Sequence, residues 1–420
     1  MAPKDVVVLG AGFAGLETAF QLAAQLTDDQ VATTVVSDRD DFLFKPNTIY
    51  LPFGAAEAPL HIPLAKAMAR RDIRHRIGTV TDVDVAGGRV HLTTGLPLHY
   101  DRLVIATGAA MAPEEVPGLA EHAYQVWTSG QLHRLGEALQ WAVADARYGR
   151  QQRVVFLVPP GNKCAGPLYE LAFMLDTWLR RRDVRHQVEV VFRTYEHTFV
   201  QAFGPRLHEV VTAEFADRDV DGRTGAVVTK VGESELLFEG GTEEYYDLLV
   251  AFPPYVASVR YEGLAADDRG FLTCDPASRA LVDHPEIFAP GDAGDFPVKQ
   301  AFLAFLQADA AAGAIAAEIR GTAPADAFSP TGMCVMEMFD KATFAQVPLI
   351  ETGDPSAPVA VNQDQADAYR VGTSPIWRLG KKALGLYLPM RFRRGLPFHS
   401  GLGWRAMEVA LRVGARTLAR

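Results

Sequence analysis

Cysteine is scarce in this chain, and long apolar runs are missing. The three cysteines in 420 residues, Cys164, Cys274 and Cys334, are too few for a disulfide framework. Any disulfide between them is therefore expected to take part in a reaction and not to stabilise the fold. No stretch reaches the ~20 consecutive apolar residues that span a bilayer. The opening residues, MAPKDVVVLGAG, have neither a basic start nor a cleavable apolar segment. We therefore expect a cytoplasmic protein that associates at most with a membrane surface.

Positive charge exceeds negative charge only at one end of the chain. The net charge is −10, but residues 371–420 hold ten Lys/Arg against one acid, which leaves +9 there and −19 elsewhere. No nucleic-acid-binding module accompanies this charge, so nucleic acid is not an expected partner. Helical projection separates apolar Trp404, Met407, Leu411, Ala415 and Leu418 from basic Arg405, Arg412, Arg416 and Arg420. Such a segment suits an anionic bilayer surface; a packed helix or a dimer face is the alternative.

Glycine gathers at the first strand-to-helix turn. The strand Val6–Leu9 runs into Gly10-Ala11-Gly12-Phe13-Ala14-Gly15 and a helix, and the next strand is Ala32–Val36. Gly10 permits the turn, Gly12 admits a pyrophosphate and Gly15 lets helix and strand pack closely, which predicts dinucleotide binding. The acid that usually ends the second strand is missing; Ser37 and Asp38 stand there, and either could hydrogen-bond a ribose.

A second turn of the same kind lacks most of its glycines. Residues 153–174, RVVFLVPPGNKCAGPLYELAFM, read as strand, tight turn and helix, where a two-dinucleotide oxidoreductase would hold a nicotinamide cofactor. Two of the three glycine positions are gone, and Cys164 stands in the turn instead. The following strand, Val188–Phe192, ends in Arg193-Thr194 rather than the acid that NADH requires. The nicotinamide site is therefore interpreted as having become a cysteine site.

Two further glycine-containing turns mark where strands end and help to divide the chain into domains. Ala106-Thr107-Gly108 ends a strand of the first unit, and Ala289-Pro290-Gly291-Asp292 ends another after the second unit, where Asp292 could bind a flavin ribityl chain. The fold class is α/β, with two Rossmann-like domains and a C-terminal amphipathic helical region. The expected domains are residues 1–112 with 284–325, then 113–283, then 326–420.

Together these motifs resemble the two-dinucleotide-fold flavoproteins of the disulfide-reductase superfamily, over roughly residues 4–320. That resemblance implies non-covalent FAD in the first domain, since no cysteine lies in residues 42–50 to attach it. Within the superfamily, residues 163–170, KCAGPLYE, and residues 333–336, MCVM, resemble the two redox-cysteine segments of sulfide:quinone oxidoreductases. The resemblance further matches His197 to a histidine after the second strand and Lys299 to a lysine near the flavin pyrimidine.

The family resemblance implies oxidation of sulfide at a Cys164–Cys334 disulfide, with the electron pair passing through FAD to a membrane quinone. Thiol–disulfide exchange fits such a centre. The helix that follows Cys164, with Lys163, is expected to favour its thiolate, and Glu170 and His197 are candidate proton handlers. The candidate quinone-site aromatics are Phe302, Phe305, Phe339 and Phe344. Cys274 is interpreted as a packed thiol, and no metal is expected.

Two other functions remain open at this point. A type II NADH:quinone oxidoreductase would share the fold, the FAD and the membrane segment, but the altered turn around Cys164 and Arg193 speak against it. A flavin-bearing redox sensor, switched by the Cys164–Cys334 pair, would form its disulfide without turnover. A homo-oligomer is compatible with each of these functions.

Overall fold

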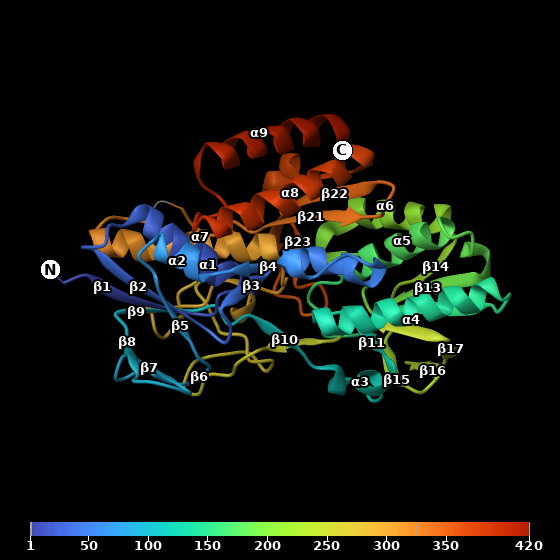
Figure 1. Ribbon diagram of the computed structural model, residues 1–420, viewed down its shortest axis with the longest axis horizontal. Coiled ribbons are helices and arrows are strands. Elements are labelled where there is room, and N and C mark those ends of the chain that lie inside the picture. Colours follow the sequence, from blue (N-terminus) through green and yellow to red (C-terminus); the bar gives the residue numbers. More distant parts are fainter. Residues whose placement is uncertain (1, 325, 420) are drawn as a thin grey trace.

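The computed structural model describes residues 2–324 and 326–419. Two parallel five-stranded sheets lie at opposite ends of the molecule, and the C-terminal segment lies above the region between them (Figure 1). The first sheet has the order β20-β9-β1-β2-β5. Its strands are β1 (Lys4–Leu9), β2 (Val31–Ser37), β5 (Arg74–Ile77), β9 (Arg102–Ile105) and β20 (Ile287–Phe288).

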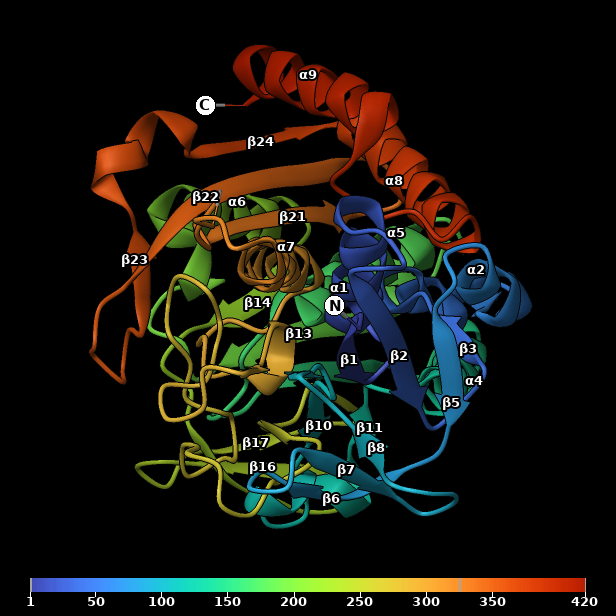
Figure 2. The ribbon, with the colours of Figure 1, turned by 90° about the vertical axis from the view of Figure 1, so that its left-hand side faces the viewer.

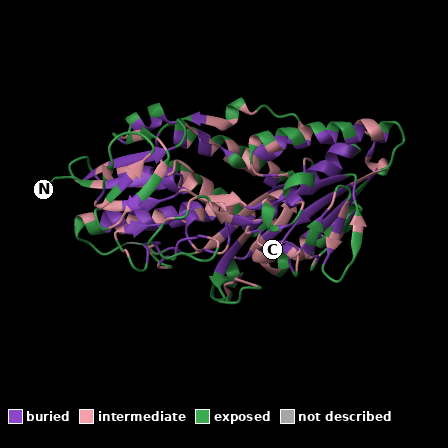
Figure 3. Ribbon diagram, turned by 90° about the horizontal axis from the view of Figure 1, so that it is seen from below, coloured by how far each residue is buried: buried purple, intermediate pink, exposed green. Residues whose placement is uncertain are grey.

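The central strands of the first sheet are buried and read as apolar runs, as is usual for parallel strands that helices cover on both faces, whereas the edge strand β5 is polar and mostly exposed. In β1, Val6 through Leu9 are at most 2% exposed, and Leu9 pairs with Val36 of β2 and Ile105 of β9. Helix α1 (Phe13–Gln25) packs against α7 (Ala301–Arg320). Figure 3 shows the strands of both parallel sheets as mostly buried.

The second sheet has the order β11-β18-β12-β13-β14. Its strands are β11 (Tyr124–Gln125), β12 (Gln152–Val158), β13 (Val188–Thr194), β14 (Val220–Arg223) and β18 (Leu248–Ala251). Helix α5 (Gly166–Arg180) follows β12, so the predicted strand–turn–helix unit around Cys164 is present. The α/β class with two Rossmann-like units is thus confirmed.

The C-terminal segment forms a sheet as well as the predicted helices. Antiparallel β22 (Ala342–Glu351) pairs with β21 (Thr331–Glu337), β23 (Val359–Val361) and β24 (Arg370–Ser374). Figure 2 shows α8 (Pro375–Arg393) and α9 (Gly401–Leu418) following this sheet. Strand β21 contacts α5, α7 and α8, which brings the segment carrying Cys334 to the first two units.

Smaller elements complete the chain. They are β3 (Asp41–Leu43), β4 (His61–Pro63), β6 (Val80–Asp84), β7 (Arg89–Leu92), β8 (Leu98–His99), β10 (Ala109–Met111), β15 (Val228–Val231), β16 (Glu235–Phe238), β17 (Glu243–Tyr245), β19 (Tyr255–Ala257), α2 (Ala65–Ala69), α3 (Leu119–His122), α4 (Ser129–Arg147) and α6 (Gly204–Asp217). A 3-10 helix, Lys45–Phe53, occupies the aromatic segment after β3.

One helix of the described chain, α7, is long and apolar enough to cross a bilayer by length and composition alone. Because 61% of its apolar window is buried within the protein, α7 has the character of a core helix.

Candidate active site

The first strand-to-helix turn has the close approaches that a phosphate loop requires. A Cβ at Gly15 would stand 1.9 Å from the Gly10 carbonyl oxygen, and one at Gly10, whose φ is +103°, would stand 2.3 Å from the Ala106 oxygen. At Gly12, by contrast, a Cβ would meet nothing within 4 Å. The turn is therefore packed on its protein side and open at Gly12, the position that admits a pyrophosphate.

Phe13 and Ala14, which lie between Gly12 and Gly15, contact segments from later in the chain. Phe13 packs edge-on against Phe305, with ring centroids 5.4 Å apart. A Cβ at Gly291 would lie 2.8 Å from the Cβ of Ala14, so the Gly291-Asp292 turn sits directly on the start of α1. Two predicted cofactor segments, far apart in sequence, thus meet at one edge of the first sheet.

Of the two residues predicted to bind a ribose, Ser37 already makes hydrogen bonds within the protein, whereas Asp38 is exposed. Ser37 donates a hydrogen bond to the Arg39 carbonyl at 2.6 Å, and its Oγ also lies 2.7 Å from His75 Nε2. Asp38 is exposed, with one contact of 3.4 Å to Arg39. Asp38 is therefore the better placed of the two to receive a ribose hydroxyl.

The Ala106-Thr107-Gly108 turn is held by the segment after β19. Ser258 Oγ donates to the Thr107 carbonyl at 2.6 Å, and Tyr261 lies 3.4 Å from Thr107 Oγ1. Gly108 has φ of +75° and open space where a side chain would stand. A side chain at this position would therefore be strained and would fill the edge of the sheet.

Lys299 and Asp292 act on each other's charge near the cysteine loop, and the Lys299 ammonium donates to the Gly294 carbonyl. Burial lowers the Lys299 pKa to about 8, and the Asp292 carboxylate opposes that shift. Burial likewise raises the Asp292 pKa, against the attraction of Lys299 and Lys45. The backbone N–H of Lys299 donates to the Lys163 carbonyl at 3.2 Å, which fixes Lys299 to the residue before Cys164.

The two predicted redox cysteines lie at one place although 170 positions separate them. Both are free, half-buried thiols. Cys164 stands just before α5, and Cys334 lies mid-way along β21 with its Sγ 3.9 Å from where a Cβ at Gly166 would be. The absence of a side chain at Gly166 therefore leaves room for Cys334 at the start of α5. Cys274 is buried elsewhere, with its Sγ 3.2 Å from the Leu272 carbonyl.

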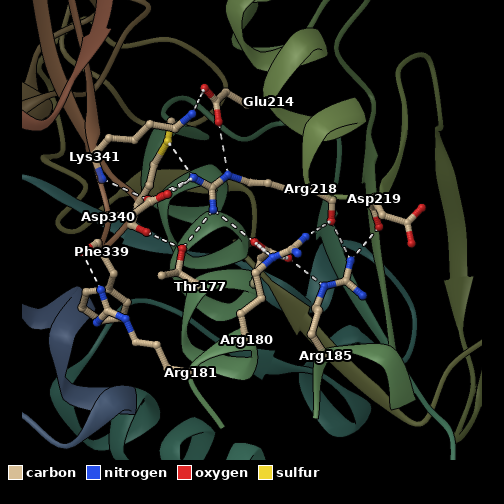
Figure 4. Close-up of polar contacts among 12 residues, drawn as sticks. Thr177, Arg180, Arg181, Arg185, Glu214, Arg218, Asp219, Phe339, Asp340 and Lys341 are labelled. Atoms are coloured by element: carbon tan, nitrogen blue, oxygen red, sulfur yellow. Dashed lines mark hydrogen bonds and ion pairs between the residues drawn. The ribbon is translucent and has the colours of Figure 1, made fainter. Parts of the chain in front are cut away.

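A charged cluster fixes the turn after β21 against the second domain (Figure 4). Arg218 donates to both carboxylate oxygens of Asp340, at 3.0 and 2.9 Å, and to fully buried Asp176 of α5 at 3.1 Å. Thr177 donates to the Met338 carbonyl at 2.6 Å. Arg218 and Asp176 are buried and costly to separate, while Asp340 is half exposed; together with the Thr177 bond, these contacts attach the turn after β21, and so the strand that carries Cys334, to α5.

The thiols do not ionise as readily as the sequence suggested. Burial raises the Cys164 pKa to about 12, and the Asp292 carboxylate raises it further. Burial also holds the Cys334 pKa well above its usual value, with Glu170 as the next cause. The expectation that the Cys164 thiolate is favoured is therefore wrong for this state, because burial and the neighbouring carboxylates raise the thiol pKa more than the bond from the Gly166 N–H lowers it.

Glu170 lies between the thiols and the C-terminal helices. It forms an ion pair with Lys381 of α8, and it accepts the Glu337 N–H at 2.7 Å. Burial raises the Glu170 pKa and the charge of Lys381 opposes the shift. Glu337 is itself fully buried and accepts from Tyr50 and Arg378, each at 2.8 Å.

His197 is exposed, whereas its neighbour Glu196 is buried and is one of the acids whose charge acts on Cys164. Glu196 accepts hydrogen bonds from Tyr169 at 2.9 Å and Thr194 at 2.8 Å, and burial raises its pKa. Its charge also raises the Cys164 pKa. Glu196 was not predicted from the sequence because residues 194–199 have no pattern that shows which of their side chains point into the protein and which point to solvent. Asn162 was not predicted either, although an Asn two residues before Cys164 is the pattern of an Asx turn.

A cavity of about 590 Å³ opens beneath α8. Tyr50, Phe53 and Phe339 line it together with Lys381 and Leu386. Of the four aromatic quinone candidates, Phe339 lies at this cavity. The other three pack elsewhere: Phe344 stacks on Trp377, Phe305 stacks on Phe398, and Phe302 contacts His399 edge-on.

Comparison with known proteins shows to which family this chain belongs. The model of the pyridine nucleotide-disulphide oxidoreductase family matches residues 4–308. The chain belongs to this family. Members of the family bind FAD, and the open position at Gly12 together with the segments gathered around it fits that cofactor.

Two relatives and one solved structure illustrate the membership. The sulfide-quinone reductase of Aquifex aeolicus is 27% identical over 284 residues, covering 66% of this chain and 64% of that protein. NADH dehydrogenase-like protein Rv1812c of Mycobacterium tuberculosis is 29% identical over 301 residues, covering 68% and 72%. The solved sulfide:quinone oxidoreductase of Aquifex aeolicus superposes with a TM-score of 0.84 at 22% identity, covering 97% and 96%. The sequence alignment with the first relative thus spans less than two thirds of that relative's length.

In this flavoprotein, Arg193 makes its ion pairs with acids of the domain in which it lies. Its side chain is 5% exposed and donates to Glu244 at 2.8 Å and Asp221 at 2.5 Å. An arginine held in this way has few donors left for the phosphate of a nucleotide.

The apolar side of α9 predicted to face a membrane packs on the protein instead. Ala415 is buried, and Leu411 and Leu418 pack with Trp377. Trp404 contacts His399, with ring centroids 4.6 Å apart. The outward apolar side chains on the two terminal helices are different ones: Ile376, Leu379, Leu386 and Met390 on α8, and Leu402, Val409 and Val413 on α9.

Proposed function

We propose that the protein is an FAD-dependent sulfide:quinone oxidoreductase that oxidises sulfide at a Cys164–Cys334 centre. The observation that carries the proposal is the meeting of Cys334 with the start of α5, at the turn where a second nucleotide would otherwise bind. Similarity over most of the chain to a protein named sulfide-quinone reductase supports it.

The chemistry balances at the cysteine pair. HS⁻ attacks one sulfur of the Cys164–Cys334 disulfide, the bond between the cysteines breaks, and a new S–S bond joins the sulfide sulfur to one cysteine while the other leaves as thiolate. The overall reaction is HS⁻ + Q + H⁺ → S⁰ + QH₂. FAD, when bound, would carry the electron pair from the thiols to the quinone. Because burial raises the pKa of both thiols, the cysteine that leaves as thiolate needs a proton donor, and Asp292, Glu170 and Glu196 are the carboxyl groups whose charges act on the two thiols.

The cavity beneath α8 is the proposed quinone site. Tyr50, Phe53 and Phe339 supply aromatic surface for a planar ring, and the Glu170–Lys381 pair stands between this cavity and the thiols. Phe339 has φ of +68°, an unusual conformation for an aromatic residue. Its N–H donates to Glu337 at 2.7 Å and its carbonyl accepts from Arg181 at 2.9 Å, which holds it there. Strain maintained in this way is typical of ligand sites.

The outward faces of α8 and α9 are the proposed membrane contact. Their exposed apolar side chains adjoin exposed Arg405, Arg412 and Arg416, a combination suited to an anionic bilayer surface. The mouth of the cavity is lined by Leu386, one of these exposed residues, so a quinone dissolved in lipid would enter directly.

A type II NADH:quinone oxidoreductase is the second candidate, favoured by the similarity to an NADH dehydrogenase-like protein. Two observations weigh against it. Arg193 is held by acids of its own domain, and the Cys164 N–H, which stands in the turn that would hold the nucleotide phosphates, is taken by the side chain of Asn162.

The test is anaerobic flavin absorbance of the purified protein. Sulfide should bleach the flavin and a soluble quinone should restore it, while NADH in a parallel sample leaves it oxidised. Cys164→Ser and Cys334→Ser should abolish bleaching by sulfide, whereas the buried Cys274→Ser serves as control and should behave like the parent. Full turnover by Cys164→Ser, or bleaching by NADH alone, would reject the proposal.

A further inference from the structure

Asn162 occupies the centre of the cysteine loop. It is 5% exposed and lies two residues before Cys164, in the loop that follows β12. Its Nδ2 donates to the Phe252 carbonyl at 2.9 Å and to the Pro253 carbonyl at 3.2 Å, and its Oδ1 accepts the Cys164 N–H at 2.9 Å. The three partners fix the orientation of the amide, because only the nitrogen end can face two carbonyls.

The same residue is held from the opposite side. Tyr195, which follows β13, donates its hydroxyl to the Asn162 carbonyl at 2.9 Å. Phe252 and Pro253 follow β18, and β12 lies between β18 and β13 in the sheet. Asn162 therefore joins the ends of three adjacent strands at the position from which Cys164 leaves the sheet.

In a nucleotide-binding Rossmann turn, the backbone N–H groups at this place point to phosphate oxygens. Here the Cys164 N–H is satisfied by Asn162 Oδ1 in an Asx turn. The loop has thus replaced an external anion by a side chain of its own, and the direction of the Cys164 backbone is fixed with it.

We propose that Asn162 is the positioning residue that presents Cys164 to Cys334. The inference rests on the proposed thiol site, but it concerns the pairing of the two sulfurs and not the identity of the donor. Without the Asn162 amide, the loop loses its attachment to Phe252 and Pro253, and the Cys164 thiol samples positions away from Cys334. The effective concentration of one thiol at the other should fall accordingly.

The measurement is the equilibrium between the dithiol and the disulfide in buffers of reduced and oxidised glutathione, with the full-length flavoprotein carrying Cys274→Ser. Two thiols and one oxidised glutathione give one protein disulfide and two reduced glutathiones, and mass spectrometry counts the forms. Asn162→Ala should lower the effective concentration of the pair at least tenfold. Asn362→Ala is the matched control, since Asn362 makes the same kind of bond, Oδ1 to the Asp364 N–H at 3.0 Å, away from the cysteines; it should change nothing.

A second variant separates positioning from folding. Asn162→Asp keeps the shape and the acceptor for the Cys164 N–H, but its carboxylate faces two carbonyls once ionised. Its pairing should therefore weaken as pH rises through the titration of that carboxyl, beyond the change seen in the parent. Unchanged effective concentration in Asn162→Ala, or a parent-like pH profile in Asn162→Asp, would overturn the inference.

The two proposals fail in different ways. Glutathione titration needs neither sulfide nor quinone. A parent protein that pairs its thiols normally but does not reduce quinone with sulfide would reject the proposed function and leave the role of Asn162 intact.

Discussion

Glu170 and Lys381 form a buried ion pair that ties the helix after the cysteine loop to the first C-terminal helix. Their side chains are 8% and 11% exposed. Glu170→Gln should lower the free energy of unfolding by about 3 kcal/mol, because it leaves the Lys381 ammonium buried without its counter-charge. Glu408→Gln, which breaks the exposed Glu408–Arg412 pair, should cost less than ~0.5 kcal/mol. Urea denaturation compares the two, and equal effects would contradict a buried pair.

A pH-dependent contact fastens the segment between α8 and α9 to the first domain. Glu17, fully buried in α1, accepts the Phe398 N–H at 2.6 Å, and burial raises its pKa to about 8. Asp309 of α7 and His399 share the cluster. Because the folded pKa lies above the unfolded one, this stability is complete below pH ~4.5 and is lost as pH rises through about 8.

Glu17→Gln keeps the acceptor oxygen and has no proton to lose. It should remove roughly 2 kcal/mol of the decline in stability between pH 5 and pH 8, after allowance for relaxation around a buried carboxylate. Thermal unfolding across that range measures the effect. An identical pH profile in the parent and in Glu17→Gln would show that Glu17 does not titrate in this window.

Glu196 and His197, adjacent in sequence, should behave differently toward Cys164. Glu196→Gln removes a carboxylate whose charge raises the Cys164 pKa, so alkylation of Cys164 by iodoacetamide at pH 8 should accelerate, by up to roughly threefold. His197→Ala should leave the rate unchanged because the residue is exposed. A faster rate in His197→Ala alone would reverse the assignment.

Phe339 combines strained backbone with a place in the wall of the cavity. Both Phe339→Ala and Phe339→Gly should raise the KM for quinone, since each removes the ring. Phe339→Gly should be the more stable of the two by about 1 kcal/mol, because glycine accepts the φ of +68° without strain. Steady-state kinetics test the expected change in quinone KM, and thermal unfolding tests the expected difference in stability. A quinone KM that is unchanged in both variants would show that Phe339 is not part of the quinone site.

The outward side of α9 should carry the binding to lipid. Replacing exposed Leu402, Val409 and Val413 with serine should weaken co-sedimentation with vesicles of anionic phospholipid several-fold while the fold is kept. Leu411→Ser, on the packed side, should instead lower the thermal midpoint because it opens the contact with Trp377. Undiminished sedimentation of the triple variant would reject this face as the membrane contact.

The sequence by itself determined the local units. Val6–Leu9 and Val154–Val158 are apolar runs that a parallel sheet buries on both faces, and the glycines at Gly10 and Gly15 stand where a Cβ would collide with backbone. Such features depend on neighbours a few residues away, so they can be read from spacing. The family resemblance, which gave FAD and the oxidoreductase class, rested on the same short motifs.

Tertiary structure decided which side chains face one another. Cys334 reaches the cysteine loop because a sheet that the sequence did not reveal carries it there, held through Asp340 and Arg218. Glu196 rather than His197 lies inward, and the apolar side of α9 is covered by Trp377. Helical periodicity shows that a helix has an apolar side, but whether protein or lipid covers that side depends on contacts between distant segments. For the same reason the pKa of Cys164 depends mainly on its burial, which the sequence did not reveal.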